Sequence, residues 1–239
     1  MEGILRHEKV WPHQLIDVLA SQILTESDSD GSFDFSDIVV VLPSLSSASA
    51  CSHRLMALAG TGVLLPFFTT FDAWSRQVPQ PFGVETKRYR ELLIYHELEK
   101  HQWLDQGNNW NLATDMAELI GELDLYQPGI NLDLEALSDR FTQAYQTRSQ
   151  KLVGFEARLL FDTWNAFSGI REGRASEQYA YRYRLSRLLE RETRRLYVLK
   201  YPELSSVEQS FIESYARRNC ATVLEADVSA PSDELRAEF

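Results

Sequence analysis

Apolar positions in residues 1–80 follow strand and helix patterns in turn. Ile4 to Val10 is a short strand candidate, and apolar residues between Gln14 and Leu24 recur with helical spacing. The run IVVVL at 38–42 is β-branched and does not alternate, which indicates a strand buried on both faces of a parallel sheet. A helix from Ser46 to Ala59 and a strand within GTGVLLPFF follow. This order predicts right-handed βαβ crossovers.

Helical periodicity dominates the middle of the chain. The predicted helices span Arg88 to Trp103, Leu112 to Tyr126, Leu134 to Tyr145, Phe155 to Phe167 and Ser176 to Arg194. The strand pattern returns at Leu196 to Leu199 and again in ATVLEAD. Between these two strands, Ser205 or Ser206 is expected to cap a helix with Glu208 in its first turn.

An α/β pattern that is interrupted by helices and then resumed predicts a doubly wound α/β domain with a parallel sheet and a large all-α insertion. We predict a first α/β part at 1–84, a helical insertion at 85–194 and the continuation of the α/β domain at 195–239. The last residues, SAPSDELRAEF, are polar and carry no capping element. We therefore expect the chain to be a truncated part of a longer protein.

Composition limits the classes of partner. The net charge of −11 and the pI of about 5.0 argue against adhesion of the whole chain to nucleic acid or to anionic membranes. The N-terminus lacks a signal-peptide core, and the longest apolar runs are far shorter than the roughly 20 residues that cross a bilayer. Cys51 and Cys220 are expected to be reduced thiols. We expect a cytoplasmic protein without membrane contact.

The segment LPSLSSAS follows a strand and opens a helix, which is where phosphate-binding loops occur. A P-loop requires glycines and a Lys followed by Ser or Thr, and LPSLSSAS contains neither Gly nor Lys. The turn after the first strand, EKVWPHQ, also lacks the motif. The serines near His53 have no G-x-S-x-G context, so Ser46 or Ser47 is predicted to be a helix N-cap. We expect no cofactor.

Two acidic segments resemble metal sites only superficially. In HELEKH, His96 and His101 are five residues apart, so they diverge by about 140° around a helix. The carboxylates at 115, 118, 122 and 124 are separated by apolar positions and are predicted to lie on a solvated helix face. We expect neither a catalytic residue nor a metal ligand in this chain.

One basic segment stands out from the acidic background. Residues 171–200 contain nine Lys or Arg against four Glu, and three tyrosines are interleaved at 179, 181 and 183. Guanidinium groups bind phosphate oxygens with two hydrogen bonds, and aromatic rings stack on bases, so this composition favours DNA contact. Alternatively, Glu190 and Glu192 pair with neighbouring arginines along the helix. The candidate DNA-binding residues are Arg182, Arg184, Arg187 and Arg191.

Several segments carry a resemblance to a known family: DIVVVLPSLSSASACSHRLMALAG, GVLLPFFTTFDAW, LLFDTWNAF and RRLYVLKYPELSSVEQSFIESYARRNCATVLEAD. Together they resemble the N-terminal part of AddB-type proteins, which are helicase-like, nuclease-bearing partner subunits of bacterial double-strand-break repair complexes, related in architecture to RecC. The resemblance implies a P-loop helicase-like fold, that of superfamily I motor domain 1A, with an inserted helical subdomain of the 1B type.

The resemblance also implies roles for particular residues. VVVLPSLSS is similar to a strand and loop that touches single-stranded DNA in active helicases, and TTFDAW is similar to the next such segment. The implied DNA-facing residues are Ser44, Ser46, Ser47, Thr69, Thr70 and Trp74. Because VWPH occupies the place of a Walker A loop, the segment resembles an inactivated helicase module. The nuclease centre of such proteins lies beyond Phe239.

The resulting hypothesis is a non-catalytic module that guides or holds single-stranded or forked DNA and contacts a helicase motor subunit. Two alternatives stay open. In the first, the α/β layer is a protein-interaction scaffold that only docks a partner subunit and does not touch DNA. In the second, the chain is a nucleotide hydrolase with a divergent site.

Overall fold

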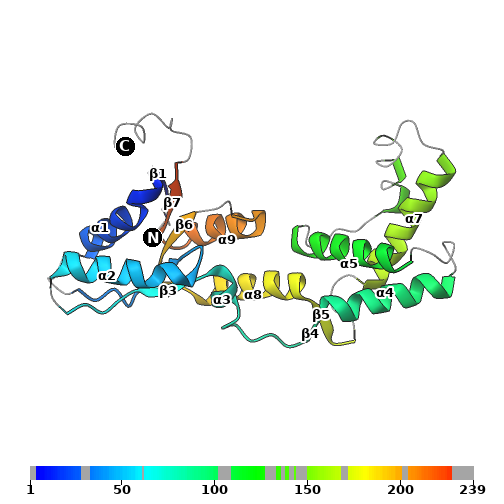
Figure 1. Cartoon of the computed structure of the whole chain (residues 1–239), viewed down its shortest axis with the longest axis horizontal. Helices are drawn as coiled ribbons and strands as arrows, with labels where there is room; N and C mark the ends of the chain where they lie inside the picture. The colour runs from blue at the N-terminus through cyan, green and yellow to red at the C-terminus, as the bar shows by residue number, and fades with distance from the viewer. Residues whose placement is uncertain are drawn as a thin grey trace, which may run out of the picture. The chain divides into compact units, whose positions relative to one another are not determined.

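The computed structural model describes residues 4–27, 33–60, 62–101, 109–126, 133–135, 138–139, 143, 150–167, 172–200 and 204–227. The chain divides into two compact units, which Figure 1 shows as ribbons. The first combines residues 1–78 and 185–239 and is named the α/β unit below. The second comprises residues 79–184 and is named the helical unit.

The α/β unit is built on a five-stranded sheet. Its strand order is β1 (Leu5–Val10), β7 (Ala221–Ala226), β6 (Arg195–Lys200), β2 (Ile38–Val41) and β3 (Phe67–Thr69). Every neighbouring pair is parallel. The predicted mixed α/β fold with a parallel sheet is therefore confirmed. The strands β6 and β7 follow the helical unit in sequence, yet they lie between β1 and β2.

Helices α1 (Leu15–Ser27) and α2 (Ala48–Ala59) cover one face of this sheet. Apolar side chains from both helices and from alternate strand positions form one buried cluster, which includes Leu19, Leu55, Val40 and Leu224. On β2 the intervening residues Val39 and Val41 are also buried, as the uninterrupted β-branched run predicts. Figure 1 shows α1 to the left of β6 and β7, α2 below them and α9 (Ser206–Ala216) to their right.

Helices α9 and α3 (Phe71–Ser75) pack together through aromatic rings. Phe211 of α9 meets Phe71 and Trp74 edge to face, at centroid distances of 5.8 and 5.7 Å. Such edge-to-face pairs add about 0.5–1.5 kcal/mol to the burial of their area. Ser205, one of the two residues that the sequence offers as the cap, caps α9 in a complete capping box with Glu208.

The third strand is shorter than the pattern GTGVLLPFF predicts. Only Phe67–Thr69 forms a strand, and Leu64 makes an isolated parallel bridge with Asp34. Pro66 lies between the two pairings and has no N–H to donate to a sheet ladder, which explains why they are not continuous. Before this segment, α2 ends at Gly60, whose φ of 68° is the left-handed conformation that favours glycine.

The helical unit contains α4 (Lys87–His101), α5 (Asn109–Tyr126) and α7 (Gln150–Phe167). Their apolar stripes meet in one cluster around Ile94, Ile120 and Trp164. Two short parallel strands, β4 (Gly83–Glu85) and β5 (Arg174–Ser176), join the two ends of the unit. Most of the predicted stripe at 134–145 lies outside the described residues.

Helix α8 (Glu177–Arg191) is shared between the units. Its residues up to Arg184 belong to the helical unit, and those from Leu185 belong to the α/β unit. The insertion predicted at 85–194 and the helical unit at 79–184 therefore differ at both ends. Among the described helices, none has the length and the apolar character that a membrane crossing requires.

Candidate nucleic-acid interface

The parallel sheet defines two edges of the α/β unit. Because all five strands run the same way, the loops that follow them lie at the carboxyl edge and the segments that precede them lie at the amino edge. In open α/β sheets, ligands bind in crevices outside the carboxyl ends of the strands. The predicted DNA-facing loops after β2 and β3 are both at the carboxyl edge.

The two loops at the carboxyl edge are held side by side. The N–H of Leu42 donates to the carbonyl of Thr69 at 2.7 Å, which extends the pairing of β2 with β3. Ser44 Oγ accepts a hydrogen bond from the N–H of Ser46 at 3.3 Å, and the two hydroxyl oxygens are 3.0 Å apart. In the next loop, Thr70 Oγ1 accepts from the N–H of Ala73 at 3.2 Å. Hydroxyl groups from adjacent strands therefore share this edge.

The cap before α2 differs from the prediction. Ser44, rather than Ser46 or Ser47, provides the capping oxygen, and it caps a 3-10 turn, η2 (Leu45–Ser47). Helix α2 begins only at Ala48, and the side chain of Ser47 makes no capping hydrogen bond. The extra turn places the first helical residue later than the sequence pattern alone suggests. It also leaves Ser44 and Ser46 exposed at the surface.

Not all of the predicted DNA-facing residues reach the surface. Ser47 and Thr70 are half-buried, so they remain partly accessible. Thr69 is buried and donates its hydroxyl to the carbonyl of Thr70 at 3.2 Å. Trp74 is 1% exposed and its ring packs on Phe211. A DNA-facing role does not fit the side chains of Thr69 and Trp74, because the hydrophobic layer between α3 and α9 uses this face of the segment.

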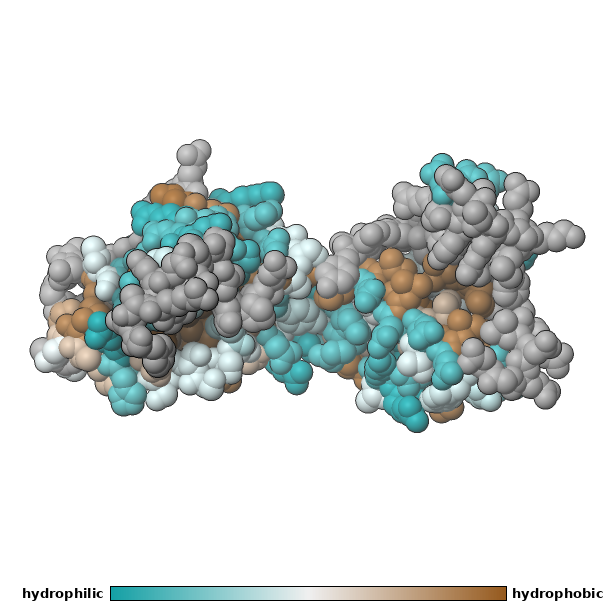
Figure 2. Space-filling model, turned by 45° about the horizontal axis from the view of Figure 1, so that its top comes forward, coloured by the Kyte–Doolittle hydropathy of each residue, from teal (hydrophilic) through white to brown (hydrophobic). Residues whose placement is uncertain are grey.

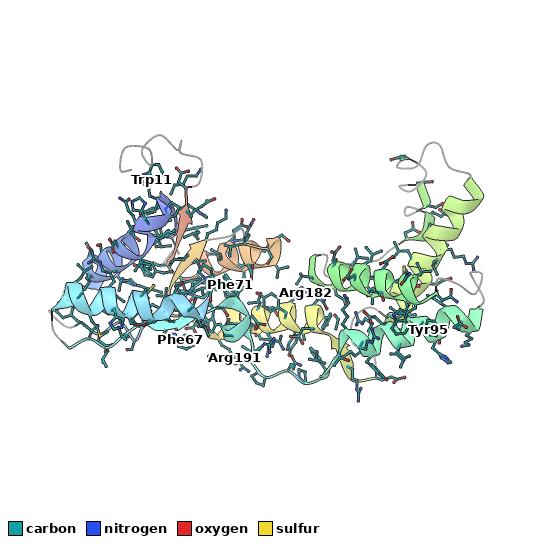
Figure 3. All side chains as sticks on the ribbon, viewed as in Figure 1. Trp11, Phe67, Phe71, Tyr95, Arg182 and Arg191 are labelled. Carbon is teal, nitrogen blue, oxygen red and sulfur yellow. The ribbon has the colours of Figure 1, made fainter. Side chains whose placement is uncertain are left out.

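The turn after β1 places an aromatic ring at the same edge. Trp11 is 40% exposed, and its ring centroid lies 6.4 Å from that of His13 in η1 (Pro12–Gln14). Figure 3 labels Trp11 beyond the carboxyl end of β1. Three strand spacings separate β1 from β2, which corresponds to about 14 Å. The sequence pattern marks this turn only as the place of a missing phosphate loop, although a Trp in an otherwise polar turn is a signal of a surface aromatic ring.

The first two predicted arginines of α8 are bound within the helical unit. Arg182 donates to the backbone carbonyl of Asp124 and lies over the ring of Tyr179, 5.1 Å from its centroid. Burial lowers the pKa of Arg182. The side chain of Arg184 is 8% exposed and donates to Glu177 Oε1 at 2.7 Å and to Gln80 Oε1 at 3.2 Å. A direct phosphate contact therefore does not fit Arg184.

The next two arginines belong to the α/β unit. Arg187 forms an exposed ion pair with Glu190 at 2.6 Å. Arg191 is exposed and makes no ion pair among the described residues. It lies just before β6, which places it at the amino edge, and Figure 3 labels Arg191 and Phe67 on the same side of the sheet. The hydroxyl loops and these arginines are thus at opposite edges.

Two of the three interleaved tyrosines, Tyr179 and Tyr183, pack against a third ring and do not form a base-stacking surface. Tyr179 and Tyr183 meet Phe82 edge to face, at centroid distances of 5.8 and 5.1 Å. Together with Ala175 and Ala180, these rings form a small hydrophobic cluster of the helical unit. The positions of Tyr179 and Tyr183 on α8 therefore reflect packing within the helical unit.

The prediction of a solvated acidic face on α5 is confirmed for Asp115, Glu118 and Glu122, which are exposed, but it is wrong for Asp124. Asp124 is buried, and its Oδ2 accepts from Arg90 Nη1 at 3.4 Å and from Ser176 Oγ at 2.7 Å. Arg90 donates in addition to Glu85 at 3.2 Å. Within the described part of the chain, no group of three or more His, Cys, Asp or Glu residues could hold a metal ion.

Comparison with known proteins adds no assignment. No protein-family model matches the chain, and no curated protein matches it.

Proposed function

We propose that this chain is a non-catalytic, helicase-like module of a DNA double-strand-break repair or recombination subunit, which holds single-stranded or forked DNA and contacts a motor subunit. The observation that carries the proposal is the pair of hydroxyl-bearing loops joined at the carboxyl edge. Their exposed residues, Ser44 and Ser46, and the half-buried Thr70 come from two adjacent strands. A cytoplasmic location belongs to the same proposal.

The chemistry of this edge suits a phosphate backbone. Hydroxyl groups donate to phosphate oxygens without reading the bases. Here the hydroxyl groups of Ser44 and Ser46 are exposed in the loop that precedes the 12-residue helix α2. The exposed ring of Trp11, about 14 Å away by strand spacing, offers a stacking surface for a base of the same strand. Phosphate contacts and base stacking together favour single-stranded DNA.

The architecture supports an inactivated helicase layout. A helical unit enters the α/β unit between β3 and β6, as the resemblance to a 1A domain with a 1B insertion implies. The turn after β1 carries Trp11, Pro12 and His13 and no glycine, so its backbone is unsuited to wrapping the phosphates of ATP. Any ATP hydrolysis or nuclease activity would belong to other parts of the assembly.

Fluorescence anisotropy with a labelled single-stranded oligonucleotide at low salt tests the proposal. We expect Ser46→Glu to weaken binding strongly, because it places a carboxylate against the phosphates. A carboxylate near the start of a helix stabilises that helix, so lost binding would not reflect unfolding. Ser210→Glu, on an exposed position of α9, is the matched control and should bind as the wild type does.

A second variant tests the stacking surface. Trp11→Ala should lose about 1–3 kcal/mol of binding free energy, the usual contribution of one stacked base. The loss should be similar for oligonucleotides of different sequence, because stacking does not read base edges. If the wild-type chain binds neither single-stranded nor forked DNA at low salt, the proposal is wrong.

A protein-interaction scaffold is the second candidate. It is favoured by exposed apolar side chains on the helical unit, namely Tyr89, Leu92 and Leu119. Figure 2 shows a brown, apolar area on this unit. Under this alternative, Ser46→Glu would leave every measurable interaction unchanged, whereas Leu92→Asp would abolish binding of a partner subunit.

A further inference from the structure

Two turns that are distant in sequence meet at the amino edge of the sheet. One joins α8 to β6, and the other joins α9 to β7. Asn219 Nδ2 donates to the carbonyl of Glu192 at 3.3 Å, and the hydroxyl of Tyr215 donates to the carbonyl of Arg194. The N–H of Leu196 donates to the carbonyl of Cys220 at 3.0 Å. These bonds fix the two turns against each other.

The two turns carry a concentration of arginines, which we name the arginine edge. Residues 187–195 and 217–218 contain six arginines and two glutamates, in a chain with a net charge of −11. The members of the arginine edge are Arg187, Arg191, Arg194, Arg195, Arg217 and Arg218. The basic segment recognised in the sequence ends at Lys200, so only the fold adds Arg217 and Arg218 to it.

Each of the two glutamates forms an ion pair with one of these arginines. Glu192 binds Arg194 at 2.7 Å, and Glu190 binds Arg187 at 2.6 Å. By contrast Arg191, Arg217 and Arg218 are exposed and make no ion pair among the described residues. Asp37, whose carbonyl accepts from the N–H of Arg195, borders the group. Guanidinium groups stay charged at every physiological pH, so the surplus of positive charge is permanent.

The backbone under the arginine edge is rigidly held. Arg194 lies over the ring of Phe67, 5.2 Å from its centroid, and receives the Tyr215 hydrogen bond on its carbonyl. Burial raises the pKa of Tyr215, so its hydroxyl keeps the proton that it donates. The arginines therefore project from a preorganised turn, which reduces the entropy that binding costs.

We propose that the arginine edge is a second nucleic-acid contact, which binds the phosphate backbone of a DNA duplex. The identification of the polyanion as DNA rests on the proposed function. Guanidinium groups match phosphate oxygens with two parallel hydrogen bonds. At this edge Phe67 is covered by Arg194, and no exposed aromatic ring among the described residues is placed to stack on a base. In a DNA duplex the bases are already paired and stacked, so a protein can bind its phosphate backbone without an exposed aromatic ring.

The two edges then divide a forked substrate between them. The carboxyl edge, with the hydroxyl loops and Trp11, suits the single strand. The arginine edge suits the duplex arm. Neither contact reads sequence, since both address phosphates or the faces of bases.

Cys220 provides a reporter at this edge. It is exposed in the turn beside Arg218, whereas Cys51 is 1% exposed and burial raises the pKa of its thiol. A maleimide fluorophore will therefore label Cys220 selectively. The matched control carries the same label at the carboxyl edge, in the double variant Cys220→Ser with Ser46→Cys. We expect a blunt duplex to change the fluorescence at Cys220, and single-stranded DNA to change it at position 46.

Charge removal tests the contact directly. The triple variant Arg191→Gln, Arg217→Gln, Arg218→Gln should bind duplex about tenfold more weakly at low salt. Its slope of log affinity against log salt should fall by about 3, since each phosphate contact contributes about 0.9 for duplex DNA. The matched control removes three exposed charges elsewhere, in Arg76→Gln, Lys100→Gln and Arg158→Gln. Circular dichroism should show that both triple variants are folded.

The outcomes separate this inference from the proposed function. If single-stranded DNA binds but duplex affinity is the same in both triple variants, the arginine edge is not a DNA contact and the proposed function stands. If no DNA of any kind binds the wild type, both are wrong. If poly-glutamate changes the Cys220 fluorescence as strongly as duplex at equal charge, the surface docks acidic proteins and the duplex assignment is overturned.

Discussion

Each half of α8 carries two arginines, but the surroundings of these arginines are opposite. In the half that belongs to the helical unit, Arg182 and Arg184 are held by a backbone carbonyl, a carboxylate and an amide. In the half that belongs to the α/β unit, Arg187 has one exposed partner and Arg191 has none among the described residues. One basic segment therefore stabilises the fold at its start and presents charge at its end.

The difference follows from how each unit satisfies its polar groups. The helical unit buries a charged network in which Asp124 joins α5 to Arg90 of α4 and to Ser176 of β5. The sheet of the α/β unit is packed instead by apolar side chains from α1 and α2. A buried cation must have partners, whereas a cation beside an apolar layer remains at the surface, in water. Local charge in a sequence therefore does not reveal which arginines can bind a ligand.

Of the variants that we propose, the removal of Asp124 should cause the largest loss of stability, and this loss should be in the helical unit. Breaking a buried ion pair from one side usually costs about 3–5 kcal/mol, because the remaining charge stays buried. For Asp124→Ala we expect about 3 kcal/mol, the lower end of that range, since Glu85 still pairs with Arg90. Native-state hydrogen exchange should show lost protection in α4, α5 and the first half of α8.

The control is on the same helix. Glu118→Ala removes a carboxylate whose partner, Lys87, is exposed, so we expect almost no change in stability. The sheet of the α/β unit should keep its protection in both variants. Equal loss of protection in β2 and β6 would show that the two units are not stabilised separately.

Substitutions at Arg184 and Arg187 should have opposite effects on stability and on affinity for duplex DNA. Arg184→Ala should lower the free energy of unfolding by about 1–2 kcal/mol, because its hydrogen bonds and its buried stem are lost. Its affinity for duplex DNA should be unchanged. Arg187→Ala should do the reverse, with stability nearly unchanged and weaker duplex binding at low salt.

Urea unfolding measures the stability of the two variants, and titration with duplex DNA measures their affinity. Weaker duplex binding by the folded Arg184→Ala variant would contradict the assignment of that residue to the interior. Unchanged binding by Arg187→Ala would restrict the arginine edge to the remaining arginines.

Much of the α/β fold is predictable from the sequence. The β-branched run at 38–42, the Ser205 cap and the apolar stripes of α4, α5 and α7 are local signals, and each corresponds to an element of the structure. The strand order is not local. Nothing near β1 indicates that β7, at Ala221–Ala226, is its neighbour, because that pairing depends on the whole sheet.

The candidate site was less predictable, for the same reason. Composition and resemblance identified Ser44 and Ser46, which are exposed at the carboxyl edge. Periodicity could not show that Trp74 packs on Phe211, which lies far along the chain, or that Asp124 pairs with Arg90. Arg217 and Arg218 were missed because they join Arg191 only through the contact between two turns.

The smallest effect concerns Glu192, which reduces the charge of the arginine edge. Burial by itself would raise the pKa of Glu192, but hydrogen bonds from Arg194 and Thr193 outweigh it and hold the pKa below its usual value. A carboxyl group with a lowered pKa in the folded state stabilises that state above its unfolded-state pKa of about 4.3. This contribution is lost as the pH falls through the folded-state pKa.

We therefore expect Glu192→Gln to be less stable than the wild type at neutral pH, by no more than about 1 kcal/mol, because the pair with Arg194 is partly open to water. The difference should disappear in acid, where the wild-type carboxyl is also neutral. Urea unfolding between about pH 3 and pH 7 measures it. The variant also frees Arg194, so it should bind duplex more tightly, whereas unchanged duplex affinity would mean that Arg194 contributes to the fold of the turn alone.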